Sequence, residues 1–393
     1  MNWQEAWQRQ FVTEADWLKI VRQQGLDTFL QHGLPQPKME AWRYLRLKAL
    51  ERLEFMLPDP ADVPAIVDNT TGTAATSPAL FSFRGAAHQK KERFWGQWAT
   101  LDHPFCALNE AFWQDGLFVE WAKGKTLQLG AVFPASRPLT MQHWRNWILL
   151  QEDAKAELFF HWQGQAEKNL TTTVSEIVLE KGAELILNFA DTNVGFGFHP
   201  LFITVKEGAR LQLNFLMMQG EISRHEITVQ LEGSMANCNI AGFIWGEQKR
   251  QADMTLLIKH DAPQAISNAH IRALGRDQAR VIVNGKIVVQ PGAFQSEGRL
   301  EAHQLLLSKD AEIDVKPQLE IYNDDVQCSH GATVGKLDEE ALFYLESRGM
   351  DRKSAEEILT YAFARAPFAE IPSLFRDELA RALPATVMED GHA

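Results

Sequence analysis

The sequence has little cysteine. Its three cysteines, Cys106, Cys238 and Cys328, are odd in number and lie far apart in a chain of 393 residues. Neither a disulfide framework nor a CxxC metal knuckle can be drawn from them, and such usage is typical of a reducing compartment. The chain also lacks a long run of Lys and Arg, and its formal net charge is −12. We therefore expect no nucleic-acid partner.

Long hydrophobic runs are missing too. No window approaches the roughly 18 uninterrupted apolar residues that a membrane span needs. The start, MNWQEAWQRQFVTEADW, has no basic segment followed by an apolar one, as a secretory signal would. We expect a cytoplasmic protein without a membrane partner. Its hydrophobic fraction of 45% and charged fraction of 23% are close to the globular average, which excludes global disorder.

The N-terminal part has helical spacing. Apolar residues recur every three to four positions at Trp7, Phe11 and Leu18, and Gly25 is expected to break this run. From residue 58 to 78 the sequence is rich in Pro, Thr, Ala and Asp and has no apolar period. This composition predicts a linker or a mobile loop.

An internal repeat is the most informative pattern. IVLEKGAELILNF at 177–189 and ITVKEGARLQLNF at 203–215 match at seven of thirteen positions and lie 26 residues apart. Each copy has two alternating apolar strands joined by a Gly-Ala corner, and weaker echoes continue to about residue 294. Stacking such units buries an apolar face that one unit cannot cover, which favours a β-solenoid. A β-sandwich with coincidental similarity is the alternative.

Helical spacing returns after about Gly335. Asp338 is predicted to cap a first helix that Gly349 ends, and Ser354 with Glu357 forms a capping-box pattern before a second helix. The expected organisation is an N-terminal helical region and linker over 1–78, a β-helix core over 79–334, and a C-terminal helical region over 335–393.

Two patterns that suggest catalysis fail on inspection. SHGATVGKL at 329–337 places three residues between its glycines, where a nucleotide-binding loop needs four, and Leu337 follows the lysine. Asp324 and Asp325 are adjacent, so in a strand they point to opposite faces and cannot act together on one bond without a bulge. A solvated turn or a helix cap is the simpler interpretation of this pair.

Cys328 and His330 are separated by one residue, so in a strand both side chains point to the same face. A thiolate and an imidazole together can hold a soft metal or an iron-sulfur species, but a closed site normally takes four ligands. The other ligands would have to come from another chain. The alternative is structural, with Cys328 a small apolar group and His330 a hydrogen-bonded turn residue.

Three segments carry a resemblance to a known family. KPQLEIYNDDVQCSHGATVGKLDEEALFYLESRGM at 316–350 resembles the C-terminal block of the SufB/SufD family of iron-sulfur cluster assembly proteins. GLPQPKMEAWRY at 33–44 and FCALNEAFWQDGLFVEWAKG at 105–124 resemble its N-terminal helical element and its entry into the core. SufB relatives tend to be longer and read HEATV where this chain has HGATVG, which favours the SufD branch.

The resemblance implies a right-handed parallel β-helix between N- and C-terminal helical regions, acting as a non-catalytic scaffold of the SUF complex. It implies pairing with SufB through the β-helix, docking of the ABC-type ATPase SufC by the C-terminal helices, and self-pairing of the isolated chain. ATP hydrolysis would belong to SufC. The candidate docking residues are Leu342, Phe343, Tyr344, Leu345, Ile358 and Phe363.

By the same resemblance, the family's functional histidine falls on His330, facing a SufB cysteine where the cluster is built, and a family cysteine falls on Cys328. No cofactor would be bound stably by this chain alone, since iron or a nascent cluster is held transiently at the SufB interface. The sequence departs from the family pattern at Arg299, Asn323 and Gln327, where Gln, Ala and Lys are common. Of these, Arg299 bears on any role for its position inside the solenoid.

Two other functions stay open. One is a purely architectural SufB paralogue whose only duty is to recruit SufC. The other is a β-solenoid carbohydrate-active enzyme that works through carboxylates such as Asp324 and Asp325.

Overall fold

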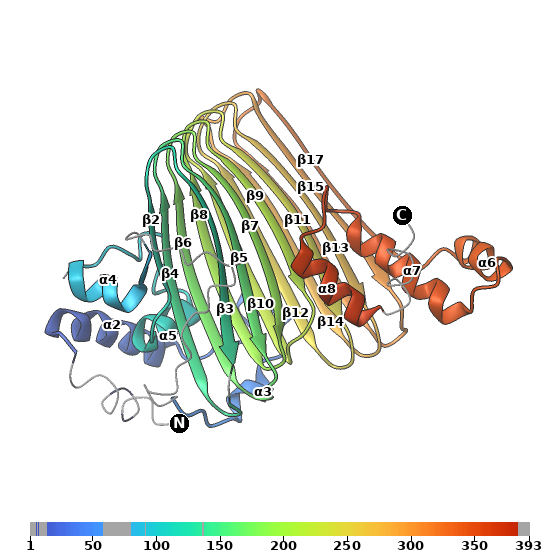
Figure 1. The fold of residues 1–393 in the computed structure, drawn as a ribbon, viewed down its shortest axis with the longest axis horizontal. Helices are drawn as coiled ribbons and strands as arrows, with labels where there is room; N and C mark the ends of the chain where they lie inside the picture. The colour runs from blue at the N-terminus through green and yellow to red at the C-terminus, as the bar shows by residue number, and fades with distance from the viewer. Residues whose placement is uncertain are drawn as a thin grey trace.

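The computed structural model describes residues 14–57, 80–90, 92–135 and 137–383, together with Glu5 and Trp7. The predicted linker at 58–78, Phe11 of the N-terminal pattern and the last ten residues, 384–393, lie outside the described residues. The described chain is mainly β, with helices before and after a long stack of strands (Figure 1).

The strands form two sheets. The nine-stranded sheet has the order β1 (Leu80–Ser82), β2 (Leu117–Trp121), β4 (Met141–Leu150), β6 (Leu170–Leu179), β8 (Phe196–Val205), β10 (Ile222–Leu231), β12 (Gln251–His260), β14 (Arg280–Val289) and β16 (Glu312–Ile321). The eight-stranded sheet has the order β17 (Val326–Gly335), β15 (Ser296–Leu306), β13 (Ile266–Gly275), β11 (Asn237–Gly246), β9 (Arg210–Met217), β7 (Glu184–Asn193), β5 (Lys155–Gly164) and β3 (Thr126–Ala135).

Consecutive strands from β2 onward alternate between the two sheets, and their pairing within each sheet is parallel. The chain therefore winds as a β-solenoid, as the repeat predicted. The sandwich alternative is wrong, because its sheets would consist of antiparallel strands. Strand β1 is the exception, since it pairs antiparallel with β2.

The internal repeat corresponds to two successive coils. Ile177 pairs with Ile203 and Phe189 with Phe215, so residues 26 apart lie directly above one another. The two phenylalanine rings stack at 5.5 Å, which packs the apolar interior of neighbouring coils together. The Gly-Ala corners contain Gly182 and Gly208 with φ values of 68° and 64°, a conformation that glycine adopts without strain.

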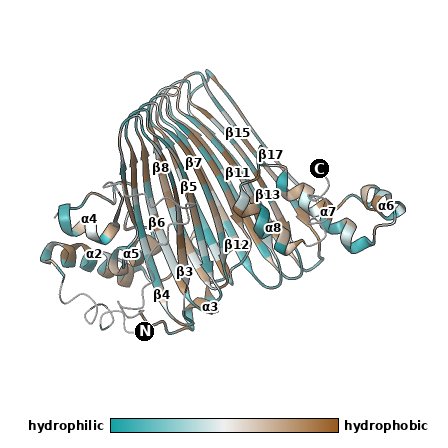
Figure 2. Cartoon of the chain, in the orientation of Figure 1, coloured by the Kyte–Doolittle hydropathy of each residue, from teal (hydrophilic) through white to brown (hydrophobic). Residues whose placement is uncertain are grey.

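The space between the two sheets is the main hydrophobic core. Alternate residues of each strand point into it, and Leu, Ile, Val, Phe and Ala dominate from Leu117 to Ala302. Figure 2 shows the matching alternation of hydrophobic and hydrophilic residues along the strands. We call this enclosed space the lumen of the solenoid.

The N-terminal helices cover the outer face of the nine-stranded sheet. They are α2 (Asp16–His32), the 3-10 helix η1 (Glu40–Trp42), α3 (Lys48–Glu51), α4 (Phe83–Lys90) and α5 (Pro104–Phe112). Phe29, Trp42 and Phe105 pack there with Phe196 and Phe198 of β8. Helices α4 and α5 fall inside the segment 79–334 that was expected to be β-helix core, and they precede the first full coil.

Gly25 does not break its helix, contrary to our expectation. Helix α2 continues through it to His32, and Gly25 is buried against α5. A Cβ at this position would lie 2.8 Å from Glu110 Cβ and 2.9 Å from the Ala107 carbonyl oxygen. The glycine is thus explained by the close approach of two helices, which a sequence pattern cannot distinguish from a helix end.

A buried ion network attaches α5 to the sheet. The Arg145 guanidinium lies 2.6 Å from a Glu110 carboxylate oxygen and 3.1 Å from one of Glu176, and all three side chains are buried. Glu176 also accepts hydrogen bonds from the backbone N–H groups of Gly96 and Gln97. Removing one partner from such a network typically costs about 3–5 kcal/mol, because a buried charge is left uncompensated.

Three helices follow the solenoid: α6 (Glu339–Ser347), α7 (Arg352–Arg365) and α8 (Ser373–Ala382). Phe368, Phe375 and Leu379 pack on the outer face of the eight-stranded sheet against residues such as Phe243 and Leu274. This contact fixes α8 and the end of α7 to the solenoid.

The predicted cap of the first C-terminal helix is confirmed. Asp338 accepts a hydrogen bond from the Glu340 backbone N–H, and Gly349 follows the end of α6 with a φ of 93°. The predicted cap of the second helix is wrong by one turn. Asp351 is the N-cap of α7, and its carboxylate accepts from both the backbone N–H and the hydroxyl of Ser354.

Candidate functional site

The last coil of the solenoid is an open end. Strands β16 and β17 stand at the edges of the two sheets, and within the described residues no further strand pairs with their outer edges. Their backbone N–H and C=O groups on that side can therefore bond to another chain. Figure 1 shows β17 at the margin of the stack.

Cys328 and His330 both belong to the lumen-facing column of this end coil. Cys328 pairs in register with Gly298, and His330 with Leu300, which is buried in the lumen. The predicted common face is therefore confirmed by the register. Cys328 packs partly against the core, whereas His330 is exposed. The two residues differ because Cys328 lies over the narrow Gly298, whose position leaves room for the sulfur.

Burial raises the pKa of the Cys328 thiol, and a hydrogen bond involving Gly298 opposes this shift in part. The thiol is therefore protonated at neutral pH, and it becomes a ligand only if a metal displaces its proton. His330 is the more accessible of the two groups. These side chains offer two ligands at most, fewer than a closed metal site takes.

Apolar side chains surround this pair. Ile313, Val315, Leu319 and Val326 pack on the core but stay partly exposed. At the two corners of the coil, Ile321, Tyr322 and Val334 are 43%, 60% and 50% exposed. Val289 and Gln304, which pair with Ile321 and Val334 in the preceding coil, are buried. The exposed apolar surface is thus a direct result of the stack ending here, and we call it the open end.

The three positions at which the sequence departs from the family pattern lie outside the lumen. Arg299 is exposed on the outer face of β15, and its Nε lies 3.7 Å from Glu301. Gln327 is exposed, and Asn323 donates a hydrogen bond to the Pro291 carbonyl oxygen in the turn before β17. Arg299 therefore has no place inside the solenoid.

Asp324 and Asp325 are exposed in the turn between β16 and β17, which agrees with the solvated-turn interpretation. The phosphate-loop lookalike at 329–335 is part of strand β17 and is not a loop before a helix. Neither segment has the geometry of a catalytic site.

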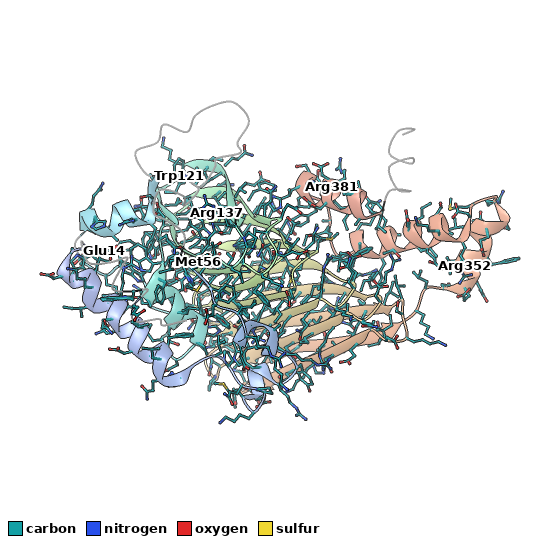
Figure 3. The ribbon with its side chains drawn as sticks, turned by 90° about the horizontal axis from the view of Figure 1, so that it is seen from below. Glu14, Met56, Trp121, Arg137, Arg352 and Arg381 are labelled. Carbon is teal, nitrogen blue, oxygen red and sulfur yellow. The ribbon has the colours of Figure 1, made fainter. Side chains whose placement is uncertain are left out.

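Helix α6 and the first part of α7 form an arm that projects from the solenoid (Figures 1 and 3). Arg352 of α7 lies 2.9 Å from Glu339 and 3.9 Å from Glu346, which ties the two helices together. Leu342 is buried between them, whereas Phe343 and Tyr344 are 72% and 57% exposed. The arm therefore presents two large aromatic side chains to its surroundings.

The remaining candidate docking residues are less available. Leu345 and Ile358 are half-buried. Phe363 is turned toward the solenoid, where its ring contacts Phe243 and the Arg272 guanidinium lies 4.6 Å from its centroid. The structure thus brings Phe343 and Tyr344 together on the arm and places Phe363 at its base.

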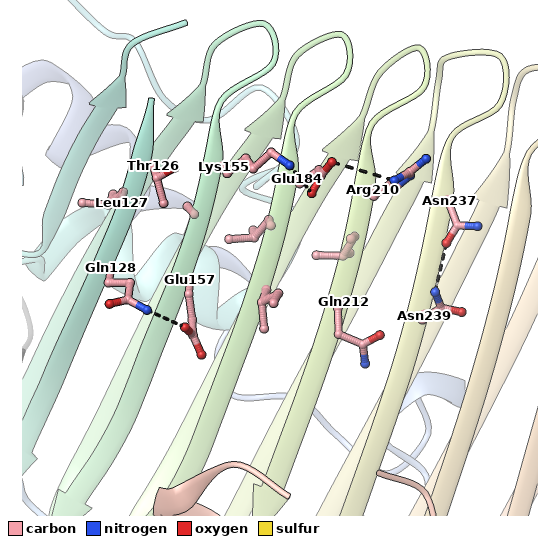
Figure 4. Close-up of a pocket in the computed structure, with 14 residues that line it drawn as sticks. Thr126, Leu127, Gln128, Lys155, Glu157, Glu184, Arg210, Gln212, Asn237 and Asn239 are labelled. Carbon is pink, nitrogen blue, oxygen red and sulfur yellow. Dashed lines mark hydrogen bonds and ion pairs between the residues drawn. The ribbon is translucent and has the colours of Figure 1, made fainter. Parts of the chain in front are cut away.

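A hollow lies on the outer face of the eight-stranded sheet (Figure 4). Its polar side chains largely compensate one another. Glu184 lies 3.1 Å from Lys155 and 3.8 Å from Arg210, and Gln128 donates to Glu157. We interpret it as a solvated outer face of the sheet.

Sequence reasoning missed one cluster entirely. Asp191, His199 and His225 meet inside the lumen, although they belong to three different strands. Each residue alone looks like an ordinary strand residue, and only the stacking register brings them together. No signal in the sequence pointed to this group.

Comparison with known proteins identifies the family. Residues 133–363, more than half of the chain, match the model of the SUF system FeS cluster assembly, SufBD core domain. Iron-sulfur cluster assembly protein SufD of Escherichia coli is 28% identical over 95% of this chain and 93% of its own length. An iron-sulfur cluster assembly SufBD family protein of Synechocystis is 25% identical over 92% of this chain and 89% of its own length.

Protein ABCI7, chloroplastic, of Arabidopsis thaliana is 26% identical over 61% of this chain and 51% of its own length. None of the described helices is both long and apolar enough to cross a membrane. A stack of parallel coils with an open C-terminal end, together with a family match over residues 133–363, leads to one conclusion. The chain belongs to the SufBD family of the SUF iron-sulfur cluster assembly system.

Proposed function

We propose that this chain is a scaffold subunit that pairs with SufB through the open end and docks the ATPase SufC through the arm. The observation that carries the proposal is the open end itself. There the outer edges of two strands are unpaired among the described residues, and the side chains of Ile313, Val315 and Leu319 are partly exposed. A second solenoid of similar cross-section is the partner that best matches two edges and an apolar interior at once.

His330 would then lie within the interface between this chain and SufB. It is exposed and lies in the lumen-facing column, so a partner coil stacked on β17 would face it. A cysteine thiolate from SufB could share iron or a nascent cluster with this imidazole. The cluster would be cargo that this interface holds and not a resident cofactor of the chain. Cys328 is a weaker candidate ligand because its thiol is partly buried.

The arm supports the second half of the proposal. Phe343 and Tyr344 project from a two-helix unit that stands away from the stack, so a partner can reach both rings. ATP hydrolysis would belong to SufC, and this chain would transmit its motion as a non-catalytic subunit. The three cysteines are free thiols, which agrees with action in the cytoplasm.

Anaerobic reconstitution with SufB and SufC tests the role of His330. Iron and sulfide are quantified in complexes made with wild type, His330→Ala and the matched control His303→Ala, whose imidazole lies one strand away on the outer face. We expect all three complexes to assemble and only His330→Ala to lose cluster. Intact complexes with unchanged cluster content in His330→Ala would favour the purely architectural alternative.

A further inference from the structure

A polar cluster lies among apolar neighbours in the lumen of the solenoid. Asp191 of β7, His199 of β8 and His225 of β10 each offer a ligand atom, and these atoms lie within 4.8 Å of one another. Asp191 Oδ2 is 3.0 Å from His225 Nε2 and 3.8 Å from His199 Nε2. The three side chains are 1% to 2% exposed.

The register explains how the cluster forms. His199 and His225 are directly paired in neighbouring strands of the nine-stranded sheet, so their rings stand above one another in consecutive coils. Asp191 reaches them from the other sheet, just before the corner that leads into β8. The cluster therefore bridges both sheets and two coils.

His199 is the unexplained member. Within the described structure neither of its ring nitrogens has a hydrogen-bond partner, although the side chain is buried. A buried polar group left in this state costs about 1–3 kcal/mol, so such groups call for a missing partner. The rest of the cluster is well held, because Asp191 accepts from the Ser223 hydroxyl at 2.6 Å and from the Asn193 backbone N–H at 3.1 Å.

Gly197 lets the His199 ring lie close to the backbone of β8. A Cβ on Gly197 would be 2.6 Å from His199 Nε2 and 3.6 Å from Asp191 Oδ2. Ligand atoms of a tetrahedral ion lie roughly 3.4 Å apart when each is about 2.1 Å from the metal. The observed spacings of 3.0 and 3.8 Å bracket that value.

We propose that Asp191, His199 and His225 bind one divalent first-row transition-metal ion inside the solenoid, through two imidazole nitrogens and one carboxylate oxygen. This donor set suits Zn²⁺ and Fe²⁺, and it disfavours Mg²⁺, which takes oxygen ligands. The ion gives His199 its missing partner and compensates the buried carboxylate. It also links two coils and both sheets at one point.

Aromatic rings line the cluster. The ring of Trp162 lies 4.5 Å from His199, and that of Phe189 stacks on His225 at 4.8 Å. These aromatic contacts orient both imidazoles and exclude water.

Metal content of the full-length chain tests the proposal. The protein is expressed in media supplemented with Zn²⁺, Fe²⁺ or Co²⁺ and purified anaerobically, and its metal is counted by mass spectrometry. We expect about one ion per chain in at least one of these media, because the three ligands converge on a single buried point. A wild-type protein without stoichiometric metal in all three media would overturn the proposal by itself.

The variants are His199→Gln and Asp191→Asn, which keep the side-chain volume, and Gly197→Ala, whose added Cβ would push against the His199 imidazole. Each is compared with the controls His270→Gln and His303→Gln, which change histidines on the outer faces of β13 and β15. We expect at least a tenfold loss of metal in the folded site variants, as checked by circular dichroism, and full content in the controls. If any folded site variant keeps its ion, the assignment is wrong.

X-ray absorption of the loaded protein gives a readout that does not depend on variants. Two imidazoles and oxygen ligands without sulfur are expected around the ion. A sulfur ligand would place the metal at a cysteine, with Cys328 the first candidate, and would overturn the assignment.

Discussion

His330 lies directly opposite Leu300 in the parallel register, yet Leu300 is 1% exposed and His330 is open to solvent. Both side chains belong to the same lumen-facing column. They differ because a further coil covers Leu300, whereas the column ends at β17. The position of a residue in the stack thus decides whether the same strand geometry gives a core residue or a site.

The open end predicts a charge-sensitive association. Val334→Lys places a charge on an exposed apolar corner of the end coil. Burying that charge in the interface with SufB would cost free energy of binding. We expect binding to SufB to weaken at least tenfold, as measured by calorimetry, with the melting temperature unchanged. The control is Ile186→Lys, an exposed apolar residue of β7 far from the end coil. Equal binding by both variants would argue against pairing through this end.

The arm makes a separate prediction. Phe343→Ala removes a ring that is 72% exposed, so the fold should lose little stability. Truncating an aromatic anchor of an interface costs about 2 kcal/mol or more, and we expect SufC binding to fall accordingly. Leu30→Ala, on the exposed face of α2, is the control and should bind SufC as wild type does. Unchanged binding by Phe343→Ala would exclude this ring from the docking surface.

We expect the substitution of Gly25 by Ala to destabilise the fold, opposite to the usual effect of this change in a helix. Gly to Ala in a helix normally stabilises, but here the added Cβ meets Glu110 and the Ala107 carbonyl oxygen at under 3 Å. We expect Gly25→Ala to lower the free energy of unfolding by about 1–3 kcal/mol, as overpacking does. Gln24→Ala, exposed in the same helix, is the control for urea denaturation. A stabilised Gly25→Ala variant would contradict the close contact of α2 and α5.

Buried histidines predict a loss of stability in mild acid. Burial lowers the pKa of His143 to about 3 and that of His260 to about 4. An unfolded histidine titrates near 6.5, so between about pH 6.5 and 4 the unfolded chain binds more protons. Stability is therefore present above pH 6.5 and falls as the pH drops, by up to about 1.4 kcal/mol per pH unit for each histidine.

His260→Gln tests this pH dependence, because an amide can replace the Nε2 contact with the Ser267 hydroxyl, which is 2.8 Å long. We expect the stability curve of this variant to be flatter between pH 6.5 and 4 by about one proton. Wild type measured in parallel gives the reference slope. The measurement is the urea midpoint across that range, and an unaltered slope in His260→Gln would refute the prediction.

Local features were predictable where local chemistry decides them. The repeat at 177–189 and 203–215 gave the stacked coils, because both sheets use the same alternation and the same glycine corner. Asp338 gave a helix start, and the spacing of Cys328 and His330 gave their common face. The prediction that Ser354 caps α7 was wrong, because Asp351 supplies the same capping chemistry one turn earlier.

The sequence by itself determined the solenoid, its helical ends and the column that contains His330, since each depends on periods of two or of about four residues. Only the tertiary structure decided that Gly25 sits at a helix contact, that the column opens at β17, and that Asp191 meets His199 and His225. These features depend on which coils and helices lie side by side. Packing over the whole stack decides which coils and helices are neighbours, and a local sequence pattern does not carry this information.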